Sequence, residues 1–187
     1  SLCSKVFCNR GYAWSYKRVT GSEPVIQSTA KNLGSYTELF IKNHDIGGIS
    51  LIKLGVNSVL FSGYDFETAV KHIALAGYDG VEVSAIKGMC EHLELDRWQE
   101  QAVELKQVVS DYGLEFLAME VASLDEDRLM KAFEAGAEIG IPVINVGPGG
   151  KTGVEEDLQN AITHLSKMSD RAKSFGVSLC VKAHVGA

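Results

Sequence analysis

From residue 51 onward, short apolar runs alternate with amphipathic stretches along this chain. Apolar residues recur at helical spacing after Asp65, Asp96 and Asp125, and again over residues 154–175. Aspartate is a favoured N-cap, so the first three are expected to start helices. The runs between these stretches are rich in Val, Ile and Leu and are typical of buried strands. The pattern therefore predicts four helices alternating with five strands, at residues 53–61, 80–84, 114–121, 143–146 and 177–181.

Each predicted helix ends at a glycine, and a strand follows almost at once. These glycines are Gly77, Gly113, Gly140 and Gly176. Glycine tolerates the left-handed conformation that turns the chain after a helix. Short connections of this kind give parallel strands joined by right-handed crossovers.

Such an α/β repeat fits either a doubly wound open sheet or part of a (β/α)8 TIM barrel. Residues 51–187 are far fewer than the ~250 of a complete barrel. The chain also stops where the fifth strand should reach its carboxyl end. We therefore predict a partial (β/α)8 barrel of about five parallel strands and four helices.

Residues 1–50 show neither helical nor strand periodicity. They mix scattered aromatic residues with Ser, Thr, Gly and Lys, which predicts an irregular or disordered leader. The codons for Gly47-Gly48 could form a purine-rich ribosome-binding sequence. They lie a few nucleotides before the codon for Leu51, which could be a TTG start codon. We hypothesise that residues 1–50 are translated upstream DNA and that the barrel occupies residues 51–187.

Charge and composition narrow the possible partners. Residues 51–187 carry 12 Lys and Arg against 21 Asp and Glu. This part of the chain therefore lacks the excess of basic residues that is typical of nucleic-acid binding. No apolar run approaches the ~20 residues that span a bilayer. The four cysteines show no paired spacing, which favours reduced thiols and a cytoplasmic location.

Four segments together resemble the sugar phosphate isomerase/epimerase family, in the xylose-isomerase-like TIM barrel group that also includes endonuclease IV and inosose dehydratase. They are KLGVNSVLF at 53–61, GYDGVEV at 77–83, VINVGPGG at 143–150 and VKAHVG at 181–186. The resemblance covers residues 52–187. It implies an eight-stranded barrel of which this chain, as a fragment, holds strands one to five.

Active sites of TIM barrels gather at the carboxyl ends of the strands. That position, with the resemblance, selects Glu82, Lys182 and His184 as catalytic residues. A carboxylate that ends an apolar strand needs a partner, and a structural contact to a neighbouring loop is the alternative for Glu82. The substrate-binding residues are predicted to be Asn57, Glu120, Asn145, Gly147 and Gly149.

The resemblance also implies a divalent metal (manganese, magnesium, cobalt or zinc), held by acidic and histidine residues on strands five to eight. The first ligand is usually the glutamate of an E-x-H motif, and Lys182 stands in its place here. A protonated ammonium cannot bind a metal. Either Lys182 binds a phosphate or carbonyl oxygen instead, or the usual site is missing. The other ligands would lie beyond residue 187, so no metal ligand is assigned.

The tripeptide Gly150-Lys151-Thr152 is similar to the end of a phosphate-binding P-loop. However, Asn145 stands where the first glycine of that motif is required, and Pro148 lacks a backbone N–H donor. These departures argue against nucleotide hydrolysis.

The leading hypothesis is a sugar or sugar phosphate isomerase or epimerase that acts by metal-assisted proton transfer next to a carbonyl. A lyase similar to inosose dehydratase is an alternative, and an abasic-site endonuclease is disfavoured by the acidic balance. The 187-residue chain alone is expected to be inactive, with an exposed strand edge that favours homo-oligomers. The expected partner is a sugar or polyol, with no nucleic acid or membrane.

Overall fold

The computed structural model describes residues 6–7, 13–14 and 52–182. Two short strands, β1 (Val6–Phe7) and β2 (Ala13–Trp14), form an antiparallel pair. The predicted leader and the proposed start at residue 51 otherwise lie outside the described residues, so both stay predictions.

One parallel sheet organises residues 52–182. Its strands are β3 (Gly55–Asn57), β4 (Gly80–Ile86), β6 (Glu115–Glu120), β7 (Val143–Val146) and β8 (Ser178–Val181). Every neighbouring pair along the order β3-β4-β6-β7-β8 is parallel. A doubly wound sheet reverses its strand order, whereas a barrel wall advances in one direction. The strand order therefore confirms the prediction of a partial TIM barrel.

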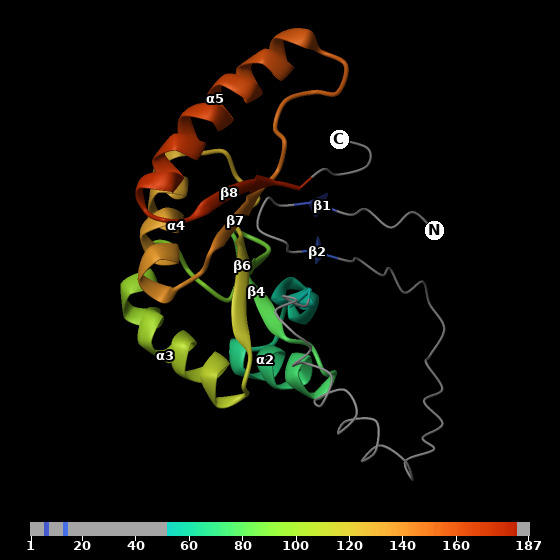
Figure 1. Ribbon diagram of the computed structural model, residues 1–187, viewed down its shortest axis with the longest axis vertical. Coiled ribbons are helices and arrows are strands. Elements are labelled where there is room, and N and C mark those ends of the chain that lie inside the picture. The colour runs from blue at the N-terminus through green and yellow to red at the C-terminus, as the bar shows by residue number, and fades with distance from the viewer. Residues whose placement is uncertain (1–5, 8–12, 15–51, 183–187) are drawn as a thin grey trace, which may run out of the picture.

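Four helices cover one side of this sheet (Figure 1). They are α2 (Phe66–Leu75), α3 (Trp98–Asp111), α4 (Glu126–Ile139) and α5 (Glu155–Ser174). The hydrophobic core lies between them and the strands, and its fully buried side chains include Ile73, Met119, Phe133, Ile144 and Met168. The opposite face of the strands is left for polar residues. No helix in the described ranges is long and apolar enough to cross a membrane.

Two of the three predicted helix caps are confirmed. The side chains of Asp65 and Asp125 each accept a hydrogen bond from a backbone N–H in the first turn. The prediction for Asp96 is wrong: Arg97 is the N-cap of α3, without a side-chain hydrogen bond. Asp96 instead forms ion pairs, including one with Lys131. The four glycines predicted to follow the helices all have positive φ, as expected.

The first predicted strand is shorter than expected. Only Gly55–Asn57 pairs as a strand, and Ser58–Phe61 forms a 3₁₀ helix, η1. The Asn57 side chain accepts a hydrogen bond from Val59 N at 2.8 Å and so caps this turn. A short strand that was not predicted, β5 (Cys90–Glu91), folds back antiparallel onto β4.

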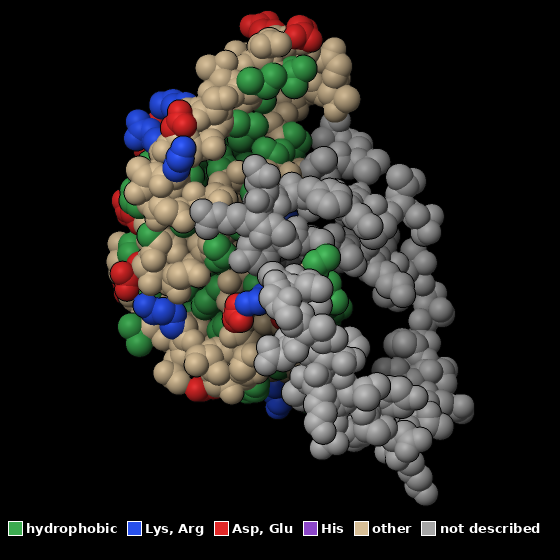
Figure 2. Space-filling model, in the orientation of Figure 1, with side chains coloured by type: hydrophobic (Ala, Val, Ile, Leu, Met, Phe, Trp, Pro, Cys, Tyr) green, Lys and Arg blue, Asp and Glu red, His purple; other side chains and the backbone are tan. Residues whose placement is uncertain are grey.

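The N-terminal half of α5 does not bury the apolar positions that helical spacing places on one face of the helix. Leu158 and Ile162 are about half exposed, at 53% and 49%, whereas Met168 and Ala172 are buried. Hydrophobic side chains show on the surface in the upper part of the molecule, where α5 lies (Figure 2). This stripe is consistent with the predicted tendency to form homo-oligomers, which stays a prediction.

Replacing the cap residue Asp125 with Ala is expected to lower the free energy of unfolding by about 1 kcal/mol. The reason is that the Arg128 N–H would lose the acceptor that it has at 2.9 Å. Asp125→Asn is the matched control, because asparagine caps equally well. Chemical denaturation of the three proteins measures this, and equal loss in both variants would contradict the capping role.

Candidate functional site

The register of the parallel strands gathers polar residues on the face opposite the helices. Asn57 lies opposite Glu82, and Glu120 lies opposite Asn145. Residues in register on parallel strands point to the same face of a sheet. Lys182 follows β8 and is two residues beyond Cys180, the register partner of Asn145, so it points the same way. The inner face therefore carries all of these side chains.

A β-bulge brings Glu120 to this face. The pairing of β4 with β6 shifts after Val81, so that Val81 opposes Phe116 but Glu82 opposes Ala118. Leu117 is the extra residue. Phe116 stacks on Phe66 of α2, on the helix side of the sheet. Without the bulge, strand alternation would also direct Glu120 to the helix side.

Five side chains form one connected set on this face, here called the inner-face network: Asn57, Glu82, Glu120, Asn145 and Lys182. Lys182 Nζ donates to Glu82 Oε2 at 2.7 Å and to Glu120 Oε2 at 2.8 Å. Asn145 Nδ2 donates to Glu82 Oε1 at 2.7 Å. Asn57 Nδ2 donates to Glu120 Oε2. Each glutamate is thus held by one amide and by the same ammonium.

The inner-face network is buried, and its electrostatics follow from that burial. Glu82 is 1% exposed and Glu120 is 8% exposed. Burial raises the pKa of Glu82; Lys182 opposes this shift and the charge of Glu120 adds to it. Burial alone would lower the pKa of Lys182, but attraction and hydrogen bonds from both glutamates outweigh burial and raise it. Lys182 therefore carries its charge at neutral pH.

The two glutamates differ in what their oxygens can still accept. Both oxygens of Glu82 are engaged, one by Asn145 and one by Lys182. Both hydrogen bonds to Glu120 end on Oε2. No described residue donates to Glu120 Oε1. Of the two carboxylates, Glu120 has the oxygen that is available to a ligand.

Three predicted site residues are not part of the inner-face network. Gly147 follows β7, and a Cβ atom there would meet nothing within 4 Å. Gly149 has a φ of 69°, and a Cβ atom there would lie 2.5 Å from Leu124 Cδ1. The local backbone conformation and the contact with Leu124 therefore explain why this residue is a glycine. The predicted roles of these glycines in substrate binding stay predictions. His184 lies outside the described residues.

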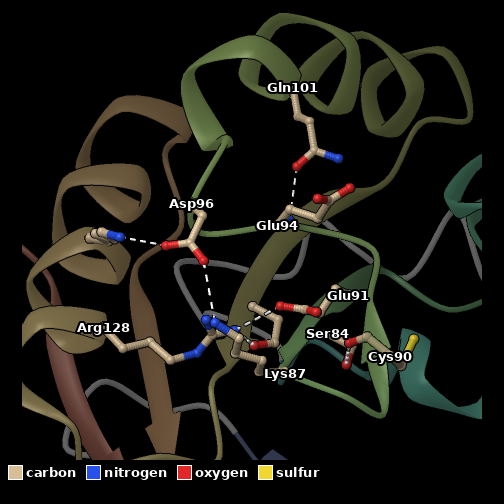
Figure 3. A network of polar contacts seen from close by, with 10 residues as sticks. Ser84, Lys87, Cys90, Glu91, Glu94, Asp96, Gln101 and Arg128 are labelled. Carbon is tan, nitrogen blue, oxygen red and sulfur yellow. Dashed lines mark hydrogen bonds and ion pairs between the residues drawn. The ribbon is translucent and has the colours of Figure 1, made fainter.

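A second polar group at the rim of the sheet was not predicted (Figure 3). Arg128 of α4 donates to Ala85 O at 2.6 Å and to Glu91 at 3.1 Å, which fastens the β4–β5 hairpin. Asp96 bridges Lys87 and Lys131 across the same opening. These groups border a cavity of about 480 Å³. A buried arginine on an amphipathic helix has no sequence signal that separates it from a solvated one.

The donor set of the inner face does not fit a divalent metal. Among residues 52–182, no three His, Cys, Asp or Glu side chains are placed to hold such an ion. The two carboxylates that come close to each other both face the ammonium of Lys182. A protonated amine has no lone pair to offer a metal.

Comparison with known proteins now identifies the family. The family model for xylose isomerase-like TIM barrels matches residues 70–187, which is more than half of the chain. The chain belongs to this family. The resemblance noted in the sequence is thereby confirmed, and the fold agrees with it.

Similar solved structures share the fold at low identity. A D-allulose 3-epimerase from Methylomonas sp. is 17% identical over 73% of this chain, with a TM-score of 0.52. A xylose isomerase-like TIM barrel protein from Mycobacterium smegmatis, in complex with magnesium, is 13% identical over 72%, with a TM-score of 0.56. An IolI protein with a bound zinc atom is 16% identical over 71%, with a TM-score of 0.54.

The match covers only part of these relatives. The chain spans about half of their length: 53%, 57% and 51%, in the same order. A search of curated proteins finds none that matches.

Proposed function

We propose that the whole protein is an isomerase or epimerase that acts on a sugar or a related polyol by moving a proton next to a carbonyl group. The observation that carries this proposal is the pair of glutamates, one on β4 and one at the end of β6, that Lys182 bridges on the inner face of the barrel strands. Family membership supports it, as does the fold that the chain shares with sugar epimerases.

The free oxygen of Glu120 suits it to act as the base. It takes the proton from the carbon next to the carbonyl, and the electron pair moves onto the carbonyl oxygen to give an enediolate. Return of the proton from Glu120 to the neighbouring carbon moves the carbonyl. Inversion of the same carbon requires a second acid, on the other side of the substrate, that delivers a proton to the opposite face while Glu120 keeps the proton that it removed. Glu82 has no free oxygen, so it positions Lys182. The sequence predicted Glu82 as a catalytic residue and Glu120 as a substrate-binding residue, and the proposal exchanges these two roles.

Divalent metals accompany some of the similar solved structures, with magnesium in one and zinc in another. Among residues 52–182, no three His, Cys, Asp or Glu side chains are placed to hold such an ion. No step proposed here passes through a metal.

Exchange of substrate hydrogen with solvent tests the proposed function. The whole protein is incubated with D-fructose or D-allulose in D₂O, and NMR follows deuterium entering next to the carbonyl. Glu120→Gln is expected to slow this exchange by about 100-fold or more, the usual contribution of a general base. Glu115→Gln, at the opposite and exposed end of β6, is the matched control and should leave the rate unchanged.

The same experiment separates the competing functions. No exchange with any ketose or polyol ketone would contradict the proposal. Exchange followed by a product one water lighter would favour the dehydratase-like lyase, since both reactions begin with removal of the same proton. The acidic balance of residues 51–187 supports a small-molecule substrate rather than nucleic acid. A cytoplasmic location stays a prediction.

A further inference from the structure

The ammonium of Lys182 lies where two buried carboxylates converge. Its Nζ is 2.7 Å from Glu82 and 2.8 Å from Glu120, and its side chain is 16% exposed. Two glutamates this close and this buried repel each other unless a cation lies between them. Here that cation belongs to the chain itself. The two asparagines fix the carboxylates on either side of it.

The ammonium also keeps one donor for a ligand. A protonated lysine has three N–H groups, and the inner-face network uses two of them. Among the described residues no acceptor takes the third. The free Oε1 of Glu120 belongs to the same cluster. A donor and an acceptor are therefore available side by side for one ligand.

We propose that Lys182 takes the place of a divalent metal in this site and that its third N–H binds the carbonyl oxygen of the substrate. The identity of that oxygen rests on the proposed function, whereas the replacement of the metal does not.

The chemistry required of this cation is modest. As Glu120 removes the proton, negative charge grows on the carbonyl oxygen, and a fixed N–H donor with positive charge stabilises it. Lys182 keeps its own proton throughout, because Glu82 stays beside it and negative charge grows on the carbonyl oxygen while Glu120 carries the transferred proton. A protonated amine cannot attack a carbonyl, so Lys182 does not form a Schiff base with the substrate.

Side-chain length offers a direct way to test the replacement. Glutamate has one side-chain bond fewer than lysine, and a metal–oxygen distance is about 2 Å. A glutamate at position 182 together with a metal ion would therefore reach at least as far as lysine now does. Lys182→Glu would bring a third carboxylate to Glu82 and Glu120, and three carboxylates are a suitable set for Mn²⁺.

Calorimetric titration of MnCl₂ into the whole protein measures this. The wild type is expected to show no Mn²⁺ site that depends on Glu120, and Lys182→Glu is expected to gain one Mn²⁺ per chain. The double variant Lys182→Glu/Glu120→Gln should lose that site again. A wild-type site that Glu120→Gln abolishes would overturn the proposal, as would failure of a folded Lys182→Glu to bind Mn²⁺. A wild-type Mn²⁺ site that Glu120→Gln leaves unchanged would also overturn the replacement if removal of its Mn²⁺ stops deuterium exchange, because the ligands that the resemblance implies lie beyond residue 187.

Two further measurements need no new metal site. Deuterium exchange by the wild type should survive dialysis against a chelator, and its loss there would overturn the proposal. Lys182→Met should slow exchange by about 100-fold or more through loss of the oxyanion donor, whereas Lys182→Arg keeps the charge and should retain more of the rate. If no ketose exchanges at all, the proposed function fails, and the wild-type Mn²⁺ titration still decides whether Lys182 replaces the metal.

Discussion

Lys182→Met is expected to lower the free energy of unfolding by about 3–5 kcal/mol, the usual cost of removing one partner from a buried ion pair. Methionine has a similar length and fills the same space, so the loss reports the charge rather than a cavity. Glu82, at 1% exposed, would be left with Asn145 as its only partner among the described residues. Denaturant titration of the variant and the wild type measures the difference.

The pH dependence of this loss has a definite sign. Burial already raises the pKa of Glu82 above 4.5, and Lys182 opposes that rise, so the pKa climbs further without it. A carboxyl group with a raised pKa binds more protons in the folded state, so its contribution is lost as pH rises through that pKa. The deficit of Lys182→Met should therefore be larger at about pH 8 than at about pH 5. An equal deficit at both pH values would contradict the buried pairing.

A double variant is the control for this prediction. Adding Glu82→Gln to Lys182→Met removes one of the two uncompensated charges and should recover part of the lost stability. If the two substitutions act additively, the two side chains are not coupled in the folded protein.

Gly80→Ala is the second change expected to have a large effect, about 3 kcal/mol of lost stability. A Cβ atom at Gly80 would collide with the backbone oxygen of Glu115 and lie 2.6 Å from Leu117 Cγ. Gly80 pairs with Glu115 across β4 and β6, so the obstacle is a sheet backbone that cannot move aside.

Gly147→Ala is the matched control for Gly80→Ala. Gly147 also lacks a positive φ, but a Cβ atom there would meet nothing within 4 Å. Its free energy of unfolding should stay within about 0.5 kcal/mol of the wild type. Thermal and denaturant unfolding of the two variants would separate crowding at Gly80 from a general cost of replacing glycine.

Much of the fold could be predicted from the sequence because its signals are local. Helical periodicity, the caps at Asp65 and Asp125, and the glycine after each helix all act within one or two turns. The prediction of β3 was too long because the Asn57 side chain captures Val59 N and starts a 3₁₀ turn. The exposed half of α5 could not be predicted, since hydrophobic periodicity does not show what covers a face.

The site could be predicted only as a set of strand ends. Position at the carboxyl end of a strand selected Asn57, Glu82, Glu120, Asn145 and Lys182, which the structure brings together. Their pairing depends on the register between strands far apart in sequence. The sequence does not encode that register locally, so the bridging position of Lys182 and the difference between the two glutamates could not be foreseen.

The bulge at Leu117 makes the site depend on how β6 pairs with β4 as well as on its composition. Deleting Leu117 would remove the extra residue and restore regular pairing, with Ala118, Met119 and Glu120 still opposite the same residues of β4. A strand of unchanged length that paired regularly would instead turn Glu120 into the hydrophobic layer beneath the helices and place Met119 beside Lys182. In related proteins that retain the glutamate, a one-residue gap at Leu117 would therefore mark the loss of the bulge and not the loss of the site.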